Sequence, residues 1–513
     1  MKKVEKKLAI IDIGSNTIRL AIYLHKEENF LKEVENIKVS ARLQNYLNYE
    51  QILTSEGLRI LKDTLKVFKE IVSLHNGTLI KVVATAAIRQ AKNKEEIKKS
   101  IREEIGLSVE ILSGEKEAYY GFLGIINSTW IQDGITIDIG GGSTEITKFI
   151  NRKMVHSHSY PFGALTLKQQ FIKDKVPTSD EMSNLSAFLQ SKFLECDWLK
   201  NCRLPIVGIG GSARNLGKID QAIKSYPIDS IHQYEMNLKD ILTVKEKLTS
   251  LSFSELQNVE GLSKERADII IPAIEVFLTI YQVVNAPFFQ FSQKGIREGI
   301  LFDEIRNDNV NEYNNQHLLE KNMRQLAIEY EIDLEKRYAA MNTVKMFLDS
   351  IRKTRIFEVN ENDIQDLRCA SFIYNVGEFI ERDSASRHTF YILSTSNING
   401  VSHRDRIKIA LLASYHSKAT FKQNIQPFKE WFTKQDRQKL RVLGAILKFS
   451  FILNSTKRQI VQDIRFIEGK DHIQLEFYCN KSWQLEQQEA EKQIKHLENA
   501  LGKKINLDFK LLS

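Results

Sequence analysis

The chain has 513 residues, of which 42% are hydrophobic and 27% charged, and it carries a net charge of +8. This length allows three or four domains, and the ordinary composition argues against long disordered linkers. The first apolar run is broken at Asp12, and the most apolar stretch, residues 269–284, is short and contains Pro272 and Glu275. We therefore expect no signal peptide and no stable membrane association. The four cysteines form no CxxC pair, which favours reduced thiols in a cytoplasmic protein.

A strand–turn–strand unit occurs twice along the chain. Residues 11–19 read IDIGSNTIR and residues 137–145 read IDIGGGSTE. Each segment predicts a buried strand that ends in an aspartate, a turn of small residues and a second strand. Such turns let backbone N–H groups approach an anion closely, and the two aspartates could hold a cation against it. Two units of this kind facing each other would clamp a phosphate chain.

Helices and strands alternate around these two units. The expected elements are a helix from Thr54, a strand at 79–84, a helix at 94–105, a strand at 109–112, a helix capped by Ser113, strands from 134 to 155, helices to 199, and a strand at 204–209 that ends in a glycine pair. This order predicts α/β layers.

The remainder of the chain has a different pattern. Beyond residue 306 helical periodicity continues to about residue 453, and it is followed by strands at 464–466, 473–478 and 505–511 with a helix at 484–501. We therefore predict four domains, with boundaries at 1–128, 129–305, 306–455 and 456–513.

The glycine-rich segment 208–213 (GIGGSA) also matches the dinucleotide-binding pattern G-x-G-x-x-A, with Asp229 near the place of the ribose-binding acid. The segment lies late in the chain, however, and a dinucleotide site would leave both strand–turn–strand units unexplained.

The duplicated unit followed by a GIGG turn resembles the superfamily of actin, sugar kinases and heat-shock ATPases. Three further segments narrow the resemblance: residues 84–89 (ATAAIR), 113–118 (SGEKEA) and 292–299 (SQKGIREG). Together the five motifs resemble the exopolyphosphatase/guanosine-pentaphosphate phosphohydrolase family over the first ~300 residues. The resemblance implies an α/β fold with two ribonuclease-H-like (actin-like ATPase) subdomains, followed by an all-α HD-like domain and a small α+β tail.

The resemblance also assigns site residues. Glu117 matches the catalytic glutamate, which orients and deprotonates water, and Arg89 matches a phosphate-gripping catalytic arginine. Asp138 and Glu145, with Asp12 opposite, match acids associated with Mg²⁺. The expected phosphate-binding residues are Ser15, Asn16, Arg89, Gly141, Gly142, Ser143, Thr144, Gly210, Gly211 and Ser212.

The helical region departs from the pattern of HD enzymes. Tyr374 and Asn375 stand where a metal-binding His-Asp pair would be needed, so we expect no second metal site there. Residues 401–460 instead hold thirteen Lys and Arg against three Asp and Glu. This basic window predicts attraction of a polyanion, and the helical domain is also a candidate for dimerisation.

The sequence thus predicts a cytoplasmic, homodimeric, Mg²⁺-dependent exopolyphosphatase that releases orthophosphate from the end of inorganic polyphosphate. Hydrolysis of guanosine pentaphosphate at the same site, and a polyphosphate- or alarmone-binding regulator with little turnover, stay open as alternatives. A kinase is disfavoured because nothing marks a pocket for a second substrate. Nucleic acid is not expected as a partner, because the chain has no RNP, KH or helix-turn-helix signature.

Overall fold

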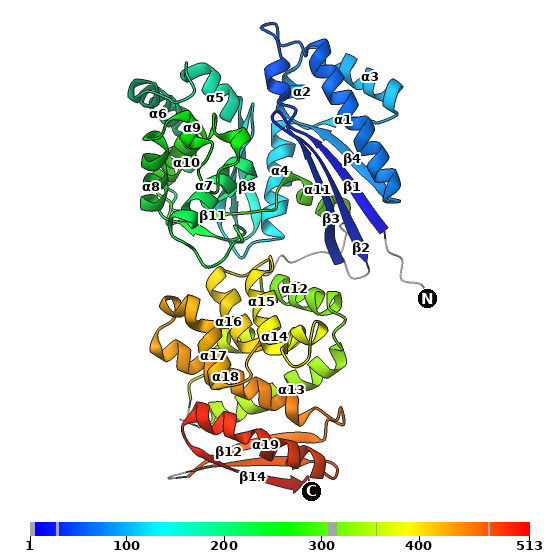
Figure 1. Cartoon of the computed structure of the whole chain (residues 1–513), viewed down its shortest axis with the longest axis vertical. Helices are drawn as coiled ribbons and strands as arrows, with labels where there is room; N and C mark the ends of the chain where they lie inside the picture. The colour runs from blue at the N-terminus through cyan, green and yellow to red at the C-terminus, as the bar shows by residue number, and fades with distance from the viewer. Residues whose placement is uncertain (1–5, 27–29, 306–314, 355–356, 470–471, 513) are drawn as a thin grey trace. The chain divides into compact units, whose positions relative to one another are not determined.

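The computed structural model describes residues 6–26, 30–305, 315–354, 357–469 and 472–512. The chain divides into two compact units, residues 1–313 and 314–513 (Figure 1). The first unit alternates helices and strands, and the second is helical before a small sheet. The class and order of the predicted architecture are therefore confirmed. The four predicted domain boundaries stay predictions, because each unit contains two of the predicted domains.

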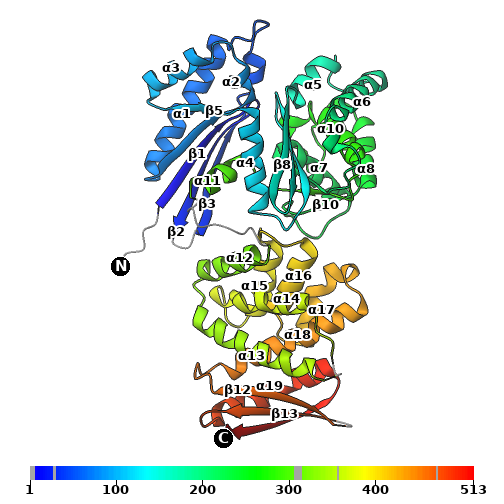
Figure 2. The same cartoon turned by 180° about the vertical axis from the view of Figure 1, so that it is seen from behind.

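The first sheet has the strand order β3-β2-β1-β4-β5. Its strands and flanking helices are β1 (Lys6–Ile13), β2 (Ile18–Lys26), β3 (Phe30–Val39), α1 (Ser55–Leu74), β4 (Thr78–Ala84), α2 (Ala86–Gln90), α3 (Lys94–Ile105), β5 (Val109–Ile111) and α4 (Gly114–Ile126). Because side chains alternate across a strand, Ile11 and Ile13 of β1 pack with α1 and α3, whereas Ile10 packs with α4. Figures 1 and 2 show these helices on the two faces of the sheet.

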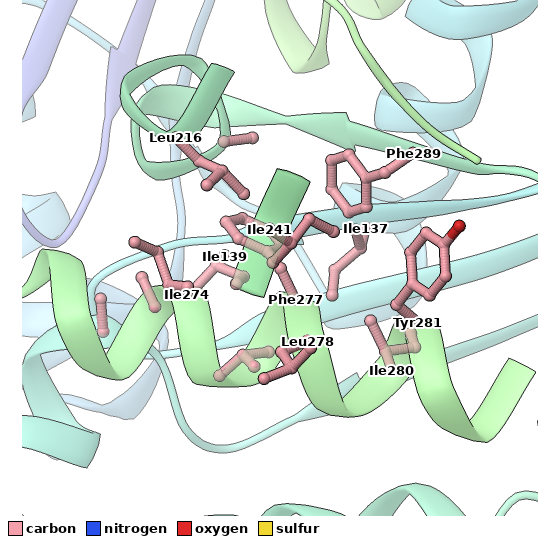
Figure 3. Packing of buried hydrophobic residues seen from close by; sticks show 14 of the residues in the cluster. Ile137, Ile139, Leu216, Ile241, Ile274, Phe277, Leu278, Ile280, Tyr281 and Phe289 are labelled. Atoms are coloured by element: carbon pink, nitrogen blue, oxygen red, sulfur yellow. The ribbon is translucent and has the colours of Figure 1, made fainter. Parts of the chain in front are cut away.

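The second sheet has the order β10-β11-β9-β6-β7-β8. Its elements are β6 (Gly134–Ile139), β7 (Thr144–Ile150), β8 (Lys153–Tyr160), α5 (Ala164–Phe171), α6 (Ser179–Leu194), β9 (Ile206–Ile209), α7 (Gly210–Ile223), β10 (Glu235–Met236), α8 (Leu238–Thr249), α9 (Phe253–Leu256), α10 (Ile270–Val284), β11 (Phe289–Phe291) and α11 (Ile296–Glu304). Ile137 and Ile139 of β6 pack against Phe277 of α10 in a continuous buried core (Figure 3). α10 is thus a buried helix.

The two predicted strand–turn–strand units form with the same register. Asp12 pairs with Arg19 across β1 and β2, and Asp138 pairs with Glu145 across β6 and β7. Each turn is closed by a backbone hydrogen bond, from Gly14 N to Thr17 O at 3.0 Å in the first and from Gly140 N to Ser143 O at 2.9 Å in the second. The sequence repeat is therefore a structural repeat.

Helix α4 lies between the two sheets. One buried cluster joins its Phe122 and Leu123 to Val83 of β4 and to Phe149 of β7, and the rings of Phe122 and Phe149 are 5.8 Å apart. The residues at the start of α4 therefore have a position fixed from both sides.

The second unit is described on its own. Its elements are α12 (Asn315–Glu329), α13 (Leu334–Arg352), α14 (Glu361–Phe372), α15 (Ala385–Thr395), α16 (His403–Ala413), α17 (Lys418–Ile425), α18 (Lys434–Leu453), β12 (Val461–Glu468), β13 (His472–Cys479), α19 (Gln484–Leu501) and β14 (Lys504–Leu511). Phe347 of α13 contacts both Phe449 of α18 and Phe477 of β13, which joins the helices to the small sheet. None of the helices in the described residues is long and apolar enough to cross a bilayer.

Tyr374 and Asn375, at the place of a His-Asp pair, have structural positions: Tyr374 packs in the core, and Asn375 adopts a left-handed backbone conformation. The Tyr374 ring is buried and stacks on Phe451 with centroids 4.3 Å apart, and Asn375 has a left-handed backbone with φ of 53°. The four cysteines carry free thiols.

Candidate active site

A cavity of about 130 Å³ opens where both turns, the start of α7 and the start of α4 meet. Its wall includes Asp12 and Asp138 at the ends of the two buried strands and Glu117 of α4. Parallel strands β1 and β4, and β6 and β9, end at this edge, which brings residues far apart in sequence together. The two repeated turns thus face one cavity.

Glu117 lies in the first turn of α4. Ser113 caps this helix by accepting a hydrogen bond from Lys116 N, so the helix start is well defined. The Glu117 side chain is only 6% exposed. Its Oε2 accepts a hydrogen bond from Arg89 Nη1 at 2.7 Å, and the same nitrogen donates to Leu112 O at 3.0 Å. The two residues predicted to be catalytic are therefore in direct contact.

Glu145 completes this cluster. Its Oε1 lies 3.6 Å from Arg89 Nη2 and accepts a hydrogen bond from Ser159 Oγ at 2.8 Å. Burial raises the pKa of Glu145 to about 7, against the opposing hydrogen bonds from Ser143 and Ser159. Burial first, and then the Glu145 carboxylate, raise the pKa of Glu117 well above its usual value, although Arg89 opposes the shift. Two carboxylates thus share one arginine in a desolvated place, as acid–base sites often do.

Asp12 and Asp138 form a second pair of acids. Burial, followed by the charge of Asp12, raises the pKa of Asp138 to about 6. Burial also raises the pKa of Asp12, although Arg297 and Arg19 oppose the shift. Two desolvated carboxylates that repel each other are the donor set a divalent cation would stabilise, and Mg²⁺ needs one or two carboxylates besides phosphate and water. The residues present therefore fit Mg²⁺. Within the described residues, no group of three or more His, Cys, Asp or Glu gathers to hold a metal by itself.

The predicted phosphate-binding residues divide into two sets. Those that line the cavity are Ser15, Asn16, Gly141, Ser143, Gly210 and Gly211. Arg89 is outside this lining and contacts Glu117 and Glu145 instead. The other three stabilise the loops from behind: the Thr144 hydroxyl donates to Phe162 O at 2.7 Å, Gly142 O accepts from Gln90 Nε2 at 3.2 Å, and Ser212 Oγ accepts from Arg266 Nη1 at 3.2 Å. Each of the three loops thus contributes two of the predicted residues to the lining of the cavity.

Asn16 gives a separate indication of a ligand. Its side chain is 6% exposed and lines the cavity. Within the described part of the chain, neither its Nδ2 nor its Oδ1 has a hydrogen-bond partner. Because buried polar groups are almost always paired, these atoms point to a polar ligand in the cavity.

Arginines also line the cavity: Arg19, Arg214, Arg266 and Arg297. Burial, followed by the charge of Arg19, lowers the pKa of both Arg214 and Arg266 to about 10. Crowded, buried guanidiniums of this kind are compensated by an anion. Arg214 directly follows the GIGGSA segment and Arg297 lies within residues 292–299, so the motifs could have indicated both. No motif marks Arg266.

Glu298 balances part of this charge. Burial acts to raise its pKa, but Lys294, Arg297, Gly295 N–H and the Tyr23 hydroxyl together hold it at about 2. The Tyr23 hydroxyl donates to Glu298 at 2.7 Å, which connects β2 to the start of α11.

Contacts across the cavity hold the first turn in place. Arg42 donates its backbone N–H to Asn16 O at 2.9 Å, and its guanidinium lies 3.3 Å from the Asp268 carboxylate. The position of the first turn is thereby coupled to residues that precede α10.

The sequence model of the Ppx/GppA phosphatase family matches residues 22–308, and the model of domain III of Ppx/GppA phosphatases matches residues 319–498. The first match alone spans more than half of the chain. The chain belongs to the Ppx/GppA phosphatase family. It is therefore a phosphohydrolase.

Solved structures agree with this assignment. The crystal structure of the Ppx/GppA family member of Aquifex aeolicus is 26% identical, with a TM-score of 0.54, and the match covers 60% of this chain and 100% of the other. A further structure of the Aquifex aeolicus PPX-GPPA enzyme is also 26% identical, with a TM-score of 0.51 over 58% of this chain and 100% of the other. An exopolyphosphatase from Cytophaga hutchinsonii, at 22% identity, has the same fold, with a TM-score of 0.54 over 59% of this chain and 99% of the other.

Proposed function

We propose that this Ppx/GppA phosphatase is a Mg²⁺-dependent exopolyphosphatase that releases orthophosphate from the end of inorganic polyphosphate. The observation that carries the proposal is the buried Glu117–Arg89–Glu145 cluster at the wall of a cavity lined by arginines and phosphate-binding turns. The cavity of about 130 Å³ accepts the end of a chain.

The reaction follows from this geometry. Glu117 accepts a proton from water, whose oxygen forms a new bond to the terminal phosphorus. The bridging P–O bond breaks, and the shortened chain leaves with the electron pair. The raised pKa of Glu117 makes it a stronger proton acceptor than an ordinary glutamate, and the contact with Arg89 favours its ionised form.

Charge stabilisation comes from the cradle. Backbone N–H groups of the two turns and the arginines that line the cavity surround the phosphoryl oxygens, where charge is largest in the transition state. Asp12 and Asp138 would hold Mg²⁺, with Glu145 beside them, and the ion would neutralise phosphate charge.

One assay tests this function. Purified protein in Mg²⁺ is given long-chain polyphosphate, and released orthophosphate is measured for wild type and for Glu117→Gln, which keeps the side-chain shape. We expect kcat to fall by about 10²–10⁴-fold in the variant, because the proton acceptor is lost. Equal rates in both proteins would remove Glu117 from this role. Binding of polyphosphate without orthophosphate release by wild type would favour a regulator instead.

Guanosine pentaphosphate is the second candidate substrate, because the same cavity accepts the end of either compound and the family name covers both activities. The basic window favours polyphosphate, since a nucleotide needs no long basic track. A side-by-side comparison of kcat/KM for the two compounds decides between them. The cytoplasmic location and the homodimer are further parts of the proposal, and sedimentation of the purified chain tests the dimer.

A further inference from the structure

A second cavity, of about 620 Å³, lies beside the active site and has no part in the reaction described above. Its wall is polar and includes Arg89, Gln90, Ser113, Ser157, His158 and Ser159. It therefore lies between the start of α4, the end of α2 and β8, which is the edge strand of the second sheet.

The two cavities meet at the catalytic cluster. Glu117 lines the first cavity, Arg89 lines the second, and Ser143 lines both. The hydrogen bond of 2.7 Å between Arg89 and Glu117 thus joins a lining residue of the second cavity to a lining residue of the first. Because an arginine side chain has several rotatable bonds, movement of this one guanidinium would connect the two spaces.

We propose that the second cavity is the exit route for the orthophosphate product. This inference rests on the proposed exopolyphosphatase function. A polyphosphate chain that enters the first cavity fills it from the mouth, so orthophosphate can leave that way only after the chain withdraws. An exit on the other side of Arg89 releases orthophosphate while the chain stays bound.

The residues that line the second cavity would bind an anion only weakly, so that it can pass through. Arg89 and the hydroxyls of Ser113 and Ser157 offer hydrogen-bond donors to phosphate oxygens. Glu115 also lines the cavity, and Glu145 accepts the hydrogen bond of Ser159 behind its wall. These carboxylates repel a phosphate dianion and shorten its residence.

The test is a pair of tryptophan substitutions on β8. Ser157→Trp fills the second cavity without touching the acids, whereas Val155→Trp places the same ring two residues earlier on the strand, where the side chain is 49% exposed and outside the cavity. Glu115→Trp is a second blocking variant, because Glu115 lines the second cavity from the first turn of α4 and is exposed. Thermal unfolding shows which variants fold.

For Ser157→Trp and Glu115→Trp we expect kcat on long-chain polyphosphate to fall about 10-fold and KM to fall with it, with kcat/KM nearly unchanged, because product release becomes rate-limiting. Val155→Trp keeps the wild-type values. Added orthophosphate inhibits wild type noncompetitively against polyphosphate, since the chain and the product occupy different cavities.

Two results would overturn the exit route: purely competitive inhibition of wild type by orthophosphate, or wild-type kcat in a folded blocking variant. These outcomes leave the proposed function intact. Failure of wild type to release any orthophosphate from polyphosphate would instead refute the function itself, and the exit route with it.

Discussion

At the scale of single residues, two buried glutamates of the site depend on the positive charge of one arginine. Glu117 and Glu145 share Arg89, at 2.7 and 3.6 Å, while both are almost completely buried. Desolvation penalises each ionised carboxylate, and one guanidinium cannot offset two of them fully. An added positive charge would therefore favour the ionised carboxylates and lower their affinity for protons. Mg²⁺ bound with the substrate would supply such a charge.

The first prediction at this scale concerns folding stability and pH. Burial raises the pKa of Glu145 from 4.5 to about 7, so the folded state binds a proton more tightly than the unfolded state. The free energy of unfolding should therefore fall as the pH rises from 4.5 to 7, with a contribution from Glu145 of up to about 3 kcal/mol. Glu145→Gln removes this contribution and should flatten the pH dependence, measured by urea unfolding at each pH.

Glu115→Gln is the control, because it removes an exposed carboxylate, in the first turn of α4. An equal flattening in both variants, or no change in Glu145→Gln, would contradict the raised pKa of Glu145.

Motifs in the sequence indicated residues that lie together in the structure, while the roles of these residues stay predictions. Glu117, Arg89 and Glu145 were predicted from three separate segments, and the structure brings them into one cluster. Arg266 could not be predicted in this way. It lines the cavity from a short helical turn, and the residues around it in the sequence match no motif. Its position depends on the packing of α10 and on the Arg42–Asp268 contact, which no local pattern encodes.

At the scale of elements, the duplicated hairpins have diverged in charge at matching positions. Arg19 occupies, in the first hairpin, the register position that Glu145 occupies in the second. The sequence predicted both hairpins because a buried strand with a small-residue turn is a strong local signal. The face-to-face placement of the turns, in contrast, depends on α4 packing between the two sheets.

The prediction for an element concerns the turn that begins α7. Gly210 has φ of +85°, and a Cβ there would lie 2.5 Å from Asp138 Oδ1. Gly210→Ala should therefore destabilise the protein by about 1–2 kcal/mol for the left-handed backbone alone. It should also lower kcat, because Asp138 must move. Thermal unfolding and orthophosphate release measure the two effects.

The matched control is Gly121→Ala in α4. A Cβ at Gly121 meets only Ile209 Cδ1, at an ordinary 3.5 Å, and alanine is favoured over glycine within a helix. This variant should keep wild-type activity and at least wild-type stability. Equal loss in both variants would show that the Gly210 turn has no special requirement.

At the scale of the whole molecule, the basic window carries less free charge than its composition suggests. Several of its cations form ion pairs inside the second unit: Arg404 with Asp436, Lys408 with Asp405, Lys439 with Asp363, and Lys457 with Asp333, while Arg458 pairs with Glu486. The acids that pair with them come partly from outside the window, so a count along the sequence could not reveal them. Part of the excess of Lys and Arg in the window therefore serves ion pairs within the second unit.

Four exposed lysines of this window remain available to a polyanion: Lys418, Lys422, Lys429 and Lys434. Among the described residues none of them forms an ion pair with a carboxylate. We call these four lysines, which lie within a short stretch from α17 to the first residue of α18, the basic face of the second unit.

If this face attracts polyphosphate, changing all four lysines to glutamate should raise KM for long-chain polyphosphate by about 10-fold and leave kcat unchanged, because the catalytic cluster is untouched. KM for tripolyphosphate should stay at the wild-type value and serves as the control, because so few phosphates gain little from basic residues outside the active site. The dependence of log KM on log salt concentration should also become shallower for the long chain, since fewer counterions are released on binding. An equal rise of KM for both substrates would locate the effect at the active site, and an unchanged KM for the long chain would show that the face does not contact substrate.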